Sequence, residues 1–350
     1  MAYTTIDDPG LYFNTVLYSG TGSSNSVTGV GFQPDWTWIK SRNNTRNHNV
    51  YDSVRGTTKV IYTDLADAES TQASGLTAFN SDGFTVVSDL GVNGASDNYA
   101  SWNWLAGGSA SSNSDGDITS SVSANQTAGF SILTYTASST ATDTVGHGLG
   151  AKPNLIIVKE INGTNQWCVA FPDVLNNNQV LQLNLTNAVF ADSAAFNDTV
   201  NTGTTSSVFV TGNGGLTGSN GQNYVAYCFA PKQGYSKFGS YKGNGNADGP
   251  FIYTGFKPAF VIMKNTADGG ASWQLFDNKR NTFNQMNGRL FPNLSNAEST
   301  DANNNIDFLS NGFKMRTSNG DTNSSGVTFI YMAFAESPFV NSNKVPNNAR

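Results

Sequence analysis

Three segments of the chain repeat one pattern: a glycine, a proline a few residues later, and five mostly apolar residues that close on a lysine. They are GFQPDWTWIK (31–40), GLGAKPNLIIVK (148–159) and GFKPAFVIMK (255–264). Successive side chains of a strand point to opposite faces, so an apolar run without alternation must be covered on both sides. The pattern therefore predicts three copies of a central, doubly buried strand. In the first copy, Thr37 between two tryptophans weakens this prediction for one face.

Other anchors follow the repeated segment in the same order in each copy. They are an opening strand (LYFNTVLYSG, FSILTYTAS, YSKFGSYKG), a second strand (NVYDS, QWCVAF, WQLFDN), a turn element (LADAES, LTNAVF, LSNAES) and a closing strand (YASWNWLA, YVAYCFA, FIYMAFA). The proline-to-closing-hydrophobe spacing is 71 residues in the first copy and 76 in the others. FNSDGF (79–84) and FLSNGF (308–313) also correspond, and SSVFV (206–210) is expected to replace that strand in the middle copy. One module is thus written three times, with length changes confined to loops.

Composition favours strands over helices. Charged residues make up only 13% of the chain, but the 12% aromatic content supplies enough apolar surface to offset the entropy of ordering. No apolar period of 3.6 residues persists for three turns, although the turn elements at 65–70 and 294–299 could each form one helical turn. Turn signals recur every 8 to 12 residues, as in sandwiches.

We therefore predict an all-β protein of three tandem, mutually similar β-sandwich (jelly-roll-like) domains. The predicted boundaries are 1–108 for the first unit, 109–127 for a Ser/Gly-rich linker, 128–231 for the second unit, 232–340 for the third unit, and 341–350 for a C-terminal tail. Three such domains in tandem form either an elongated rod or a compact block with pseudo-threefold symmetry.

Charge and segment composition exclude several classes. The net charge of −6 and the pI near 4.8 disfavour nucleic-acid binding, which needs a clustered basic face. No apolar run approaches the roughly 20 residues that span a bilayer, so no membrane insertion is expected. The opening MAYTTIDDPG lacks the basic and apolar regions of a signal peptide. Cys168 and Cys228 are expected to be buried free thiols.

The search for reactive groups yields few candidates. His48 and His147 could act as bases, but neither has a nucleophile motif beside it, so packed imidazoles are the simpler interpretation. No Cys/His spacing suits zinc. The acidic segments 111–119 and 301–307 could hold calcium, yet both lack the pattern of a calcium loop and read as Asx-rich turns.

Two carboxylates and four indoles remain. Glu69 and Glu298 could form a glycosidase pair, but they occupy equivalent positions in separate units, where Val189 stands in the middle one. Such residues more often serve the scaffold. Exposed indoles could bind carbohydrate, but alternation within strands favours a core position for all four in the first unit: Trp36, Trp38, Trp102 and Trp104. Lys40, Lys159 and Lys264 are expected where each strand emerges into water. The sequence thus predicts no enzyme, and no catalytic, cofactor-binding or metal-binding residue.

Several quoted segments resemble a family of repeated β-modules in virion proteins of marine tailed bacteriophages, which is described as structural or tail-fibre-like. They include MAYTTIDDPGLYF, GFQPDWTWIKSR, VYDSVRGTTK, ASWNWLAGG and VGHGLGAKPNLIIVK. The resemblance implies a virion structural protein of the tail or fibre, assembled in the host cytoplasm and contributing to host attachment or tail assembly. The implied partners are other virion proteins, further copies of the chain, and a host surface glycan or receptor. A capsid decoration protein or head fibre is the alternative, and a glycan depolymerase is a third hypothesis.

Overall fold

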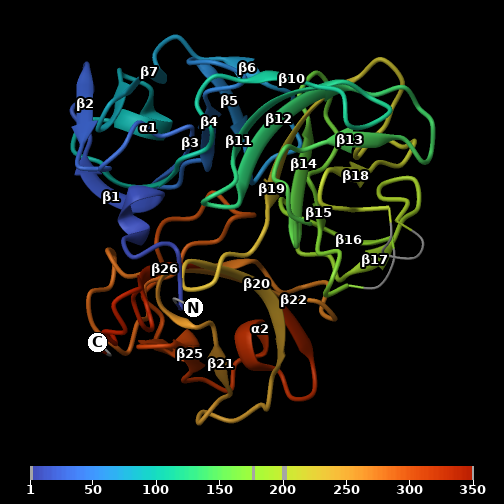
Figure 1. Cartoon of the computed structure of the whole chain (residues 1–350). Coiled ribbons are helices and arrows are strands. Elements are labelled where there is room, and N and C mark those ends of the chain that lie inside the picture. The colour runs from blue at the N-terminus through green and yellow to red at the C-terminus, as the bar shows by residue number, and fades with distance from the viewer. Residues whose placement is uncertain (1–2, 176–177, 199–202, 349–350) are drawn as a thin grey trace.

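Three lobes of antiparallel sheet make up the computed structural model, which describes residues 3–175, 178–198 and 203–348 (Figure 1). Helix in this described part is limited to α1 (Leu90–Asn93), α2 (Gly320–Asn323) and the 3-10 turns η1 (Pro9–Leu11) and η2 (Ala302–Asn304). The prediction of an all-β fold is confirmed. The short helices do not lie in the turn elements 65–70 and 294–299, where a helical turn was considered.

The first unit contains a six-stranded sheet in the order β1-β9-β3-β4-β5-β6, which faces a three-stranded sheet in the order β2-β8-β7. Its strands are β1 (Phe13–Ser19), β2 (Asn25–Thr28), β3 (Trp36–Ser41), β4 (Asn49–Asp52), β5 (Lys59–Tyr62), β6 (Ser70–Thr71), β7 (Leu76–Asn80), β8 (Gly83–Val86) and β9 (Asn98–Trp104).

The second unit has an eight-stranded sheet in the order β10-β11-β12-β19-β14-β15-β16-β17, together with the pair β13-β18. Its strands are β10 (Ser111–Asn113), β11 (Ser120–Asn125), β12 (Phe130–Thr136), β13 (Thr144–Gly146), β14 (Leu155–Glu160), β15 (Cys168–Ala170), β16 (Gln179–Gln182), β17 (Phe190–Ala191), β18 (Val208–Val210) and β19 (Asn223–Phe229). Segment 206–210 thus supplies a strand, as expected.

The third unit has sheets in the orders β20-β26-β22-β23 and β21-β25-β24. Its strands are β20 (Ser236–Lys242), β21 (Phe251–Tyr253), β22 (Phe256–Asn265), β23 (Gln274–Asp277), β24 (Ile306–Leu309), β25 (Gly312–Met315) and β26 (Thr328–Pro338). In all three units the closing strand lies between the opening strand and the strand launched by the repeated glycine–proline pattern. Superposition of the units stays a prediction.

The apolar run of each central strand is covered on both faces, as the sequence predicts. In β14, Ile156 and Val158 pack in the core of the second unit's own sandwich. Leu155 and Ile157, on the opposite face, belong to a larger cluster that contains buried side chains from all three units. We call this cluster the shared core; its members include Trp36, Trp38, Trp102, Trp104, Phe130, Tyr227, Phe260 and Phe334. The core position predicted for the four indoles is confirmed.

Aromatic contacts join the units pairwise within the shared core. Ring centroids lie 4.7 Å apart for Trp36 and Tyr227, 5.1 Å apart for Phe13 and Phe334, and 5.9 Å apart for Phe229 and Phe334. These contacts link the first unit to the second, the first to the third, and the second to the third. The chain therefore forms a three-lobed block rather than a rod (Figure 1).

Segment 109–127, expected as a linker, instead supplies β10 and β11 to the edge of the second sheet. Small polar residues are suited to this edge strand because one of its faces is exposed to solvent. On the other face, Val122 is buried in the second unit's core. The expected tail folds back: Asn341 N donates to Val345 O at 3.0 Å, and Ser342 N donates to Asp7 Oδ1 at 2.7 Å. The last two residues of the predicted tail, 349–350, lie outside the described residues.

Candidate functional site

The junctions between units are built from equivalent backbone hydrogen bonds. The turn element of each unit donates to the residue two positions after the lysine of the next unit around the ring. The donors and acceptors are Glu69 N to Ile161 O at 2.8 Å, Val189 N to Thr266 O at 2.9 Å, and Glu298 N to Arg42 O at 2.7 Å. The third unit thus binds the first, the first the second, and the second the third. The ring is closed.

Side chains repeat this arrangement. Trp167 Nε1 donates to Tyr62 O at 2.8 Å, and Trp273 Nε1 donates to Gln182 O at 3.0 Å. His48 occupies the equivalent position in the first unit, where its Nδ1 accepts from Trp38 Nε1 at 2.9 Å. Burial, reinforced by the Lys40 charge, holds the pKa of His48 well below its usual range. A neutral, packed imidazole fits the structural interpretation of this residue.

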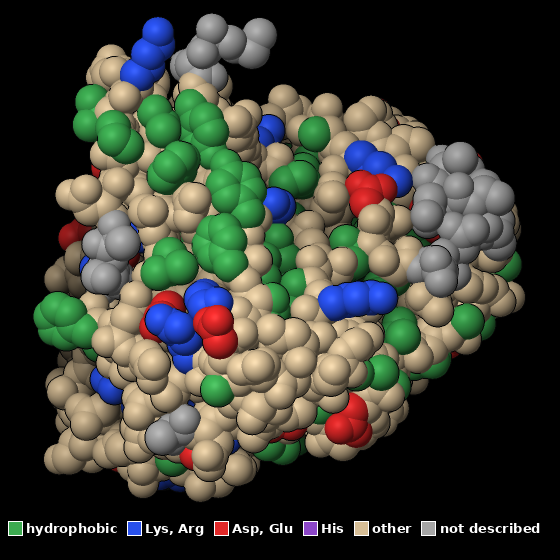
Figure 2. Space-filling view, turned by 90° about the horizontal axis from the view of Figure 1, so that it is seen from below, with side chains coloured by type: hydrophobic (Ala, Val, Ile, Leu, Met, Phe, Trp, Pro, Cys, Tyr) green, Lys and Arg blue, Asp and Glu red, His purple; other side chains and the backbone are tan. Residues whose placement is uncertain are grey.

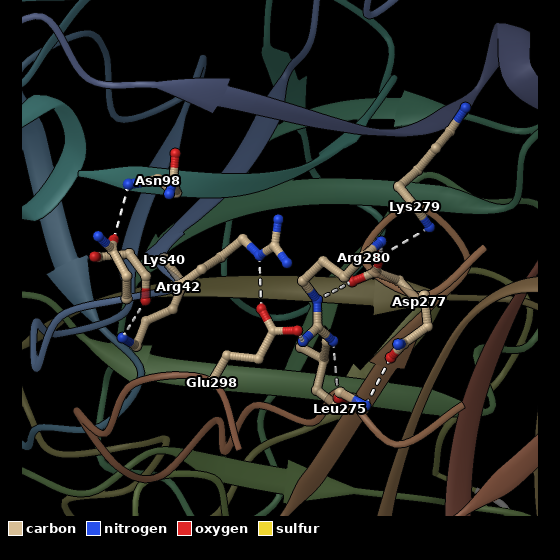
Figure 3. Close-up of polar contacts among 12 residues, drawn as sticks. Lys40, Arg42, Asn98, Leu275, Asp277, Lys279, Arg280 and Glu298 are labelled. Atoms are coloured by element: carbon tan, nitrogen blue, oxygen red, sulfur yellow. Dashed lines mark hydrogen bonds and ion pairs between the residues drawn. The ribbon is translucent and has the colours of Figure 1, made fainter. Parts of the chain in front are cut away.

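Beside two of the junctions, an arginine is held between two carboxylates. Arg55 Nε lies 2.6 Å from Asp52 Oδ2, and its Nη1 lies 3.1 Å from Glu69 Oε2. In the third unit, Arg280 Nε lies 2.5 Å from Asp277 Oδ2 and its Nη1 lies 3.5 Å from Glu298 Oε1. Figure 3 shows these three residues. Both arginine side chains are at most 2% exposed. Glu69 and Glu298 therefore neutralise buried cations of their own units.

The inner carboxylate also binds the neighbouring unit. Asp52 accepts a hydrogen bond from Tyr227 Oη at 2.7 Å, and Asp277 accepts one from Trp102 Nε1 at 3.1 Å. Strand register makes Tyr227, Trp102 and Met332 equivalent positions of the closing strands. Register and spacing likewise place Phe171 and Val174 of the second unit where the other units have aspartate and arginine.

The second unit is apolar throughout this set. Phe171, Val174 and Val189 replace the aspartate, the arginine and the glutamate, and all three pack in or against the shared core. The facing unit carries Met332, which has no strong hydrogen-bond donor, where the other junctions have Tyr227 or Trp102. Charge and donor are lost together, so the replacement leaves neither an aspartate nor an arginine without its partner at this junction.

The expectation that Lys40, Lys159 and Lys264 emerge into water is wrong, because all three residues are fully buried. Each lysine lies on the strand face that carries the shared-core residues two and four positions earlier. Its ammonium donates to the next residue's carbonyl and to one four residues on, such as Asn44 O at 3.4 Å from Lys40 Nζ or Gly163 O at 3.2 Å from Lys159 Nζ. Burial lowers the pKa of each lysine to about 8. The repeated lysine closes the turn after the strand.

An open groove of about 490 Å³ lies at the junction of the first and second units. Its first-unit wall contains Val54, Arg55 and Glu69, and its second-unit wall contains Ile161 and Asn223. The remaining lining comes from β10–β12 and the residues next to them: Ser112, Thr119, Ser120, Ser121, Thr134, Tyr135 and Thr136. We take this groove as the candidate functional site.

The other predicted candidates are not brought together. Burial lowers the pKa of His147 to about 4. Cys168 and Cys228 are buried free thiols, as predicted, and burial raises the pKa of both. Within the described residues, no group of three or more His, Cys, Asp or Glu side chains is placed to hold a metal ion. No helix in the same part of the chain is long and apolar enough to cross a membrane.

Sequence reasoning missed the buried arginines and the groove. The Asp-x-x-Arg spacing, present in VYDSVR and LFDNKR and absent from the middle unit, was the available signal for the arginines. The groove had none, because it depends on placing segment 109–127 in the second sheet.

A family model described as a domain of unknown function (DUF7483) matches residues 8–338. No curated protein and no solved structure matches the chain.

Proposed function

We propose that this chain, which belongs to the DUF7483 family, is a structural protein of a bacteriophage virion, placed in the tail or fibre and contributing to host attachment or tail assembly. The closed ring of junctions carries the proposal. Three units share one core and are cross-linked by buried polar contacts, which gives a rigid block. The location in a phage particle is proposed because the repeated segments resemble the β-modules of virion proteins.

The surface fits a component held among neighbours. Figure 2 shows one face of the molecule, where charged side chains are sparse and hydrophobic side chains gather in a band. Large apolar side chains are exposed on the third unit, including Phe283 at 78% and Tyr253 at 48%. Exposed apolar patches mark sites of contact with other proteins.

A head location is the second candidate, favoured by the ring itself. A block of three units around one core can contact three neighbours in similar ways, as a capsid decoration protein does at a site of threefold symmetry.

Particle labelling tests the proposal. Antibodies raised against the chain are expected to bind intact, purified phage particles and to show in electron micrographs whether the chain lies on the tail or the head. A copy number of roughly tens per particle supports the tail, and roughly hundreds support the head. A chain that is made during infection but absent from washed particles would overturn the proposal. New reducing ends released from host polysaccharide by the purified chain would instead establish the depolymerase.

A further inference from the structure

The groove at the junction of the first and second units differs from the equivalent places in the ring. Within the described residues, only the second unit extends its sheet beyond the opening strand, by adding β10 and β11 next to β12. The opening strands β1 and β20 are sheet edges in the other units. The added strands form a floor in front of the Arg55–Glu69 wall, which turns this junction into a groove of about 490 Å³, within the size range of small-ligand sites.

Hydroxyl groups form a row across that floor. Strand register places Ser112 opposite Ser121, and Ser121 opposite Thr134. Neighbouring strands lie about 4.8 Å apart, so the three hydroxyls repeat at that interval on one face. No hydrogen-bond partner is found for the hydroxyls of Ser112, Ser121 and Thr134 among residues 3–175, 178–198 and 203–348. They are free to bind a ligand.

The wall adds a fixed acceptor and small apolar contacts. Glu69 keeps a 16% exposed side chain, and Arg55 fixes its carboxylate at 3.1 Å. Val54 and Ile161 offer apolar surface, and the amide of Asn223, whose Oδ1 accepts from Thr136 Oγ1 at 2.7 Å, adds a donor at the far end. Arg55 also binds Asp52, and Lys59 Nζ lies 3.6 Å from Glu69 Oε1, so two cations balance the two carboxylates beside the groove.

The other two junctions lack this combination. Where the third unit meets the first, Arg42 Nε lies 2.6 Å from Glu298 Oε2, and Leu17 stands at the position equivalent to Thr134 (Figure 3 shows the Arg42–Glu298 contact). Where the second unit meets the third, valines replace the arginine and the glutamate. The described residues thus join an accessible carboxylate to a free hydroxyl row at one junction alone.

We propose that this groove binds a neutral glycan, with Glu69 and Asn223 fixing ring hydroxyls over the Ser112–Ser121–Thr134 row. A dense set of donors and acceptors matches a polyhydroxylated ligand, and the absence of net charge in the lining matches a neutral one. The assignment rests on the proposed role in host attachment, since a host surface glycan is then the ligand.

Titration of the full chain with a panel of neutral di- to tetrasaccharides of glucose, galactose, mannose and N-acetylglucosamine, followed by saturation-transfer NMR, tests the assignment. At least one member is expected to bind. The double change Ser121→Val and Thr134→Val, and separately Glu69→Gln, should each weaken that binding by about tenfold or more. Ser240→Val, on the exposed equivalent position of β20, and Glu298→Gln, at the third-to-first junction, are the matched controls and should leave it unchanged.

The assignment would be overturned if no member of the panel binds, or if sulfated and carboxylated glycans bind more tightly than neutral ones. It would also be overturned if both groove variants keep the unfolding temperature of the original chain and still bind the glycan as tightly. Particle labelling is independent of these outcomes. Labelled particles with no glycan binding would therefore reject the groove and keep the virion role, whereas unlabelled particles would reject the virion role itself.

Discussion

Tyr227 Oη donates a hydrogen bond to Asp52 Oδ2 at 2.7 Å, across the junction between the second and the first unit. The same aspartate holds Arg55, so the contact ties a buried cation of one unit to a closing strand of the next. The third-to-first junction repeats it with Trp102 and Asp277. The ring is therefore fastened by polar contacts inside an otherwise apolar region.

Removing the cation alone should be costly. Arg55→Val leaves Asp52 buried without its partner, and breaking a buried ion pair on one side costs about 3–5 kcal/mol. Urea unfolding of the variant measures this loss. A loss below about 1 kcal/mol would show that water replaces the guanidinium. Val174→Arg is the mirror control, because it places a charge at the equivalent, partly buried position, where Phe171 and Val189 replace the two carboxylates.

Replacing the whole set should be tolerated. The combination Asp52→Phe, Arg55→Val, Glu69→Val and Tyr227→Met copies the apolar junction between the second and third units into the first. Apolar replacement of complete buried ion networks is often neutral or stabilising. We expect the free energy of unfolding of the fourfold variant to lie within about 2 kcal/mol of that of the original chain. It should be well above the free energy of unfolding of the Arg55→Val variant. A fourfold variant less stable than Arg55→Val would contradict this argument.

The buried lysines predict a pH dependence. The pKa of Lys159 is lowered to about 8 in the folded chain, against 10.5 when exposed. Between these values the unfolded chain binds more protons than the folded one, so the contribution of Lys159 to folding rises with pH. The stability of the original chain relative to Lys159→Met should therefore grow between pH 8 and 10, by roughly 1 kcal/mol per pH unit. Urea unfolding at several pH values measures it; a constant difference would place the ammonium in water.

Much of the strand arrangement could be predicted from the sequence, because the repeated apolar pattern has a direct physical requirement. An apolar residue at every position of LIIVK needs two covered faces, and the structure supplies the second unit's core and the shared core. The prediction for the lysines was wrong, because it assumed that a charged residue after an apolar run is exposed to solvent. Lys159 instead points to the same buried strand face as Leu155 and Ile157, because it lies four and two residues after them. Its ammonium group donates hydrogen bonds to nearby backbone carbonyls.

The candidate groove was beyond sequence reasoning for a different reason. Its floor comes from segment 109–127, whose small polar residues are equally suited to a linker or to an edge strand. Pairing of Ser121 with Thr134 decides between them, and that pairing is a tertiary fact. Arg55 and Glu69 were each visible in the sequence, but no local signal joined them to the second unit.

The shared core predicts that the three units unfold together. Phe260 of the third unit lies 5.4 Å from Phe13 and 5.6 Å from Trp104 of the first, measured between ring centroids. Phe260→Ala should cost about 3–5 kcal/mol and lower the stability of all three units equally, because the cavity opens in the region common to them. Phe308→Ala, in the third unit's own core, is the matched control for a local cavity.

Calorimetry of the original chain should show one transition, and tryptophan fluorescence should report the same midpoint as circular dichroism, since the indoles are spread over all three units. The Phe260→Ala variant should keep this single transition at a lower temperature. Separate transitions, or release of a protease-resistant fragment close to residues 232–340, would mean that the third unit holds its fold without the shared core. In that case the aromatic contacts between units would be a docking surface between independent domains.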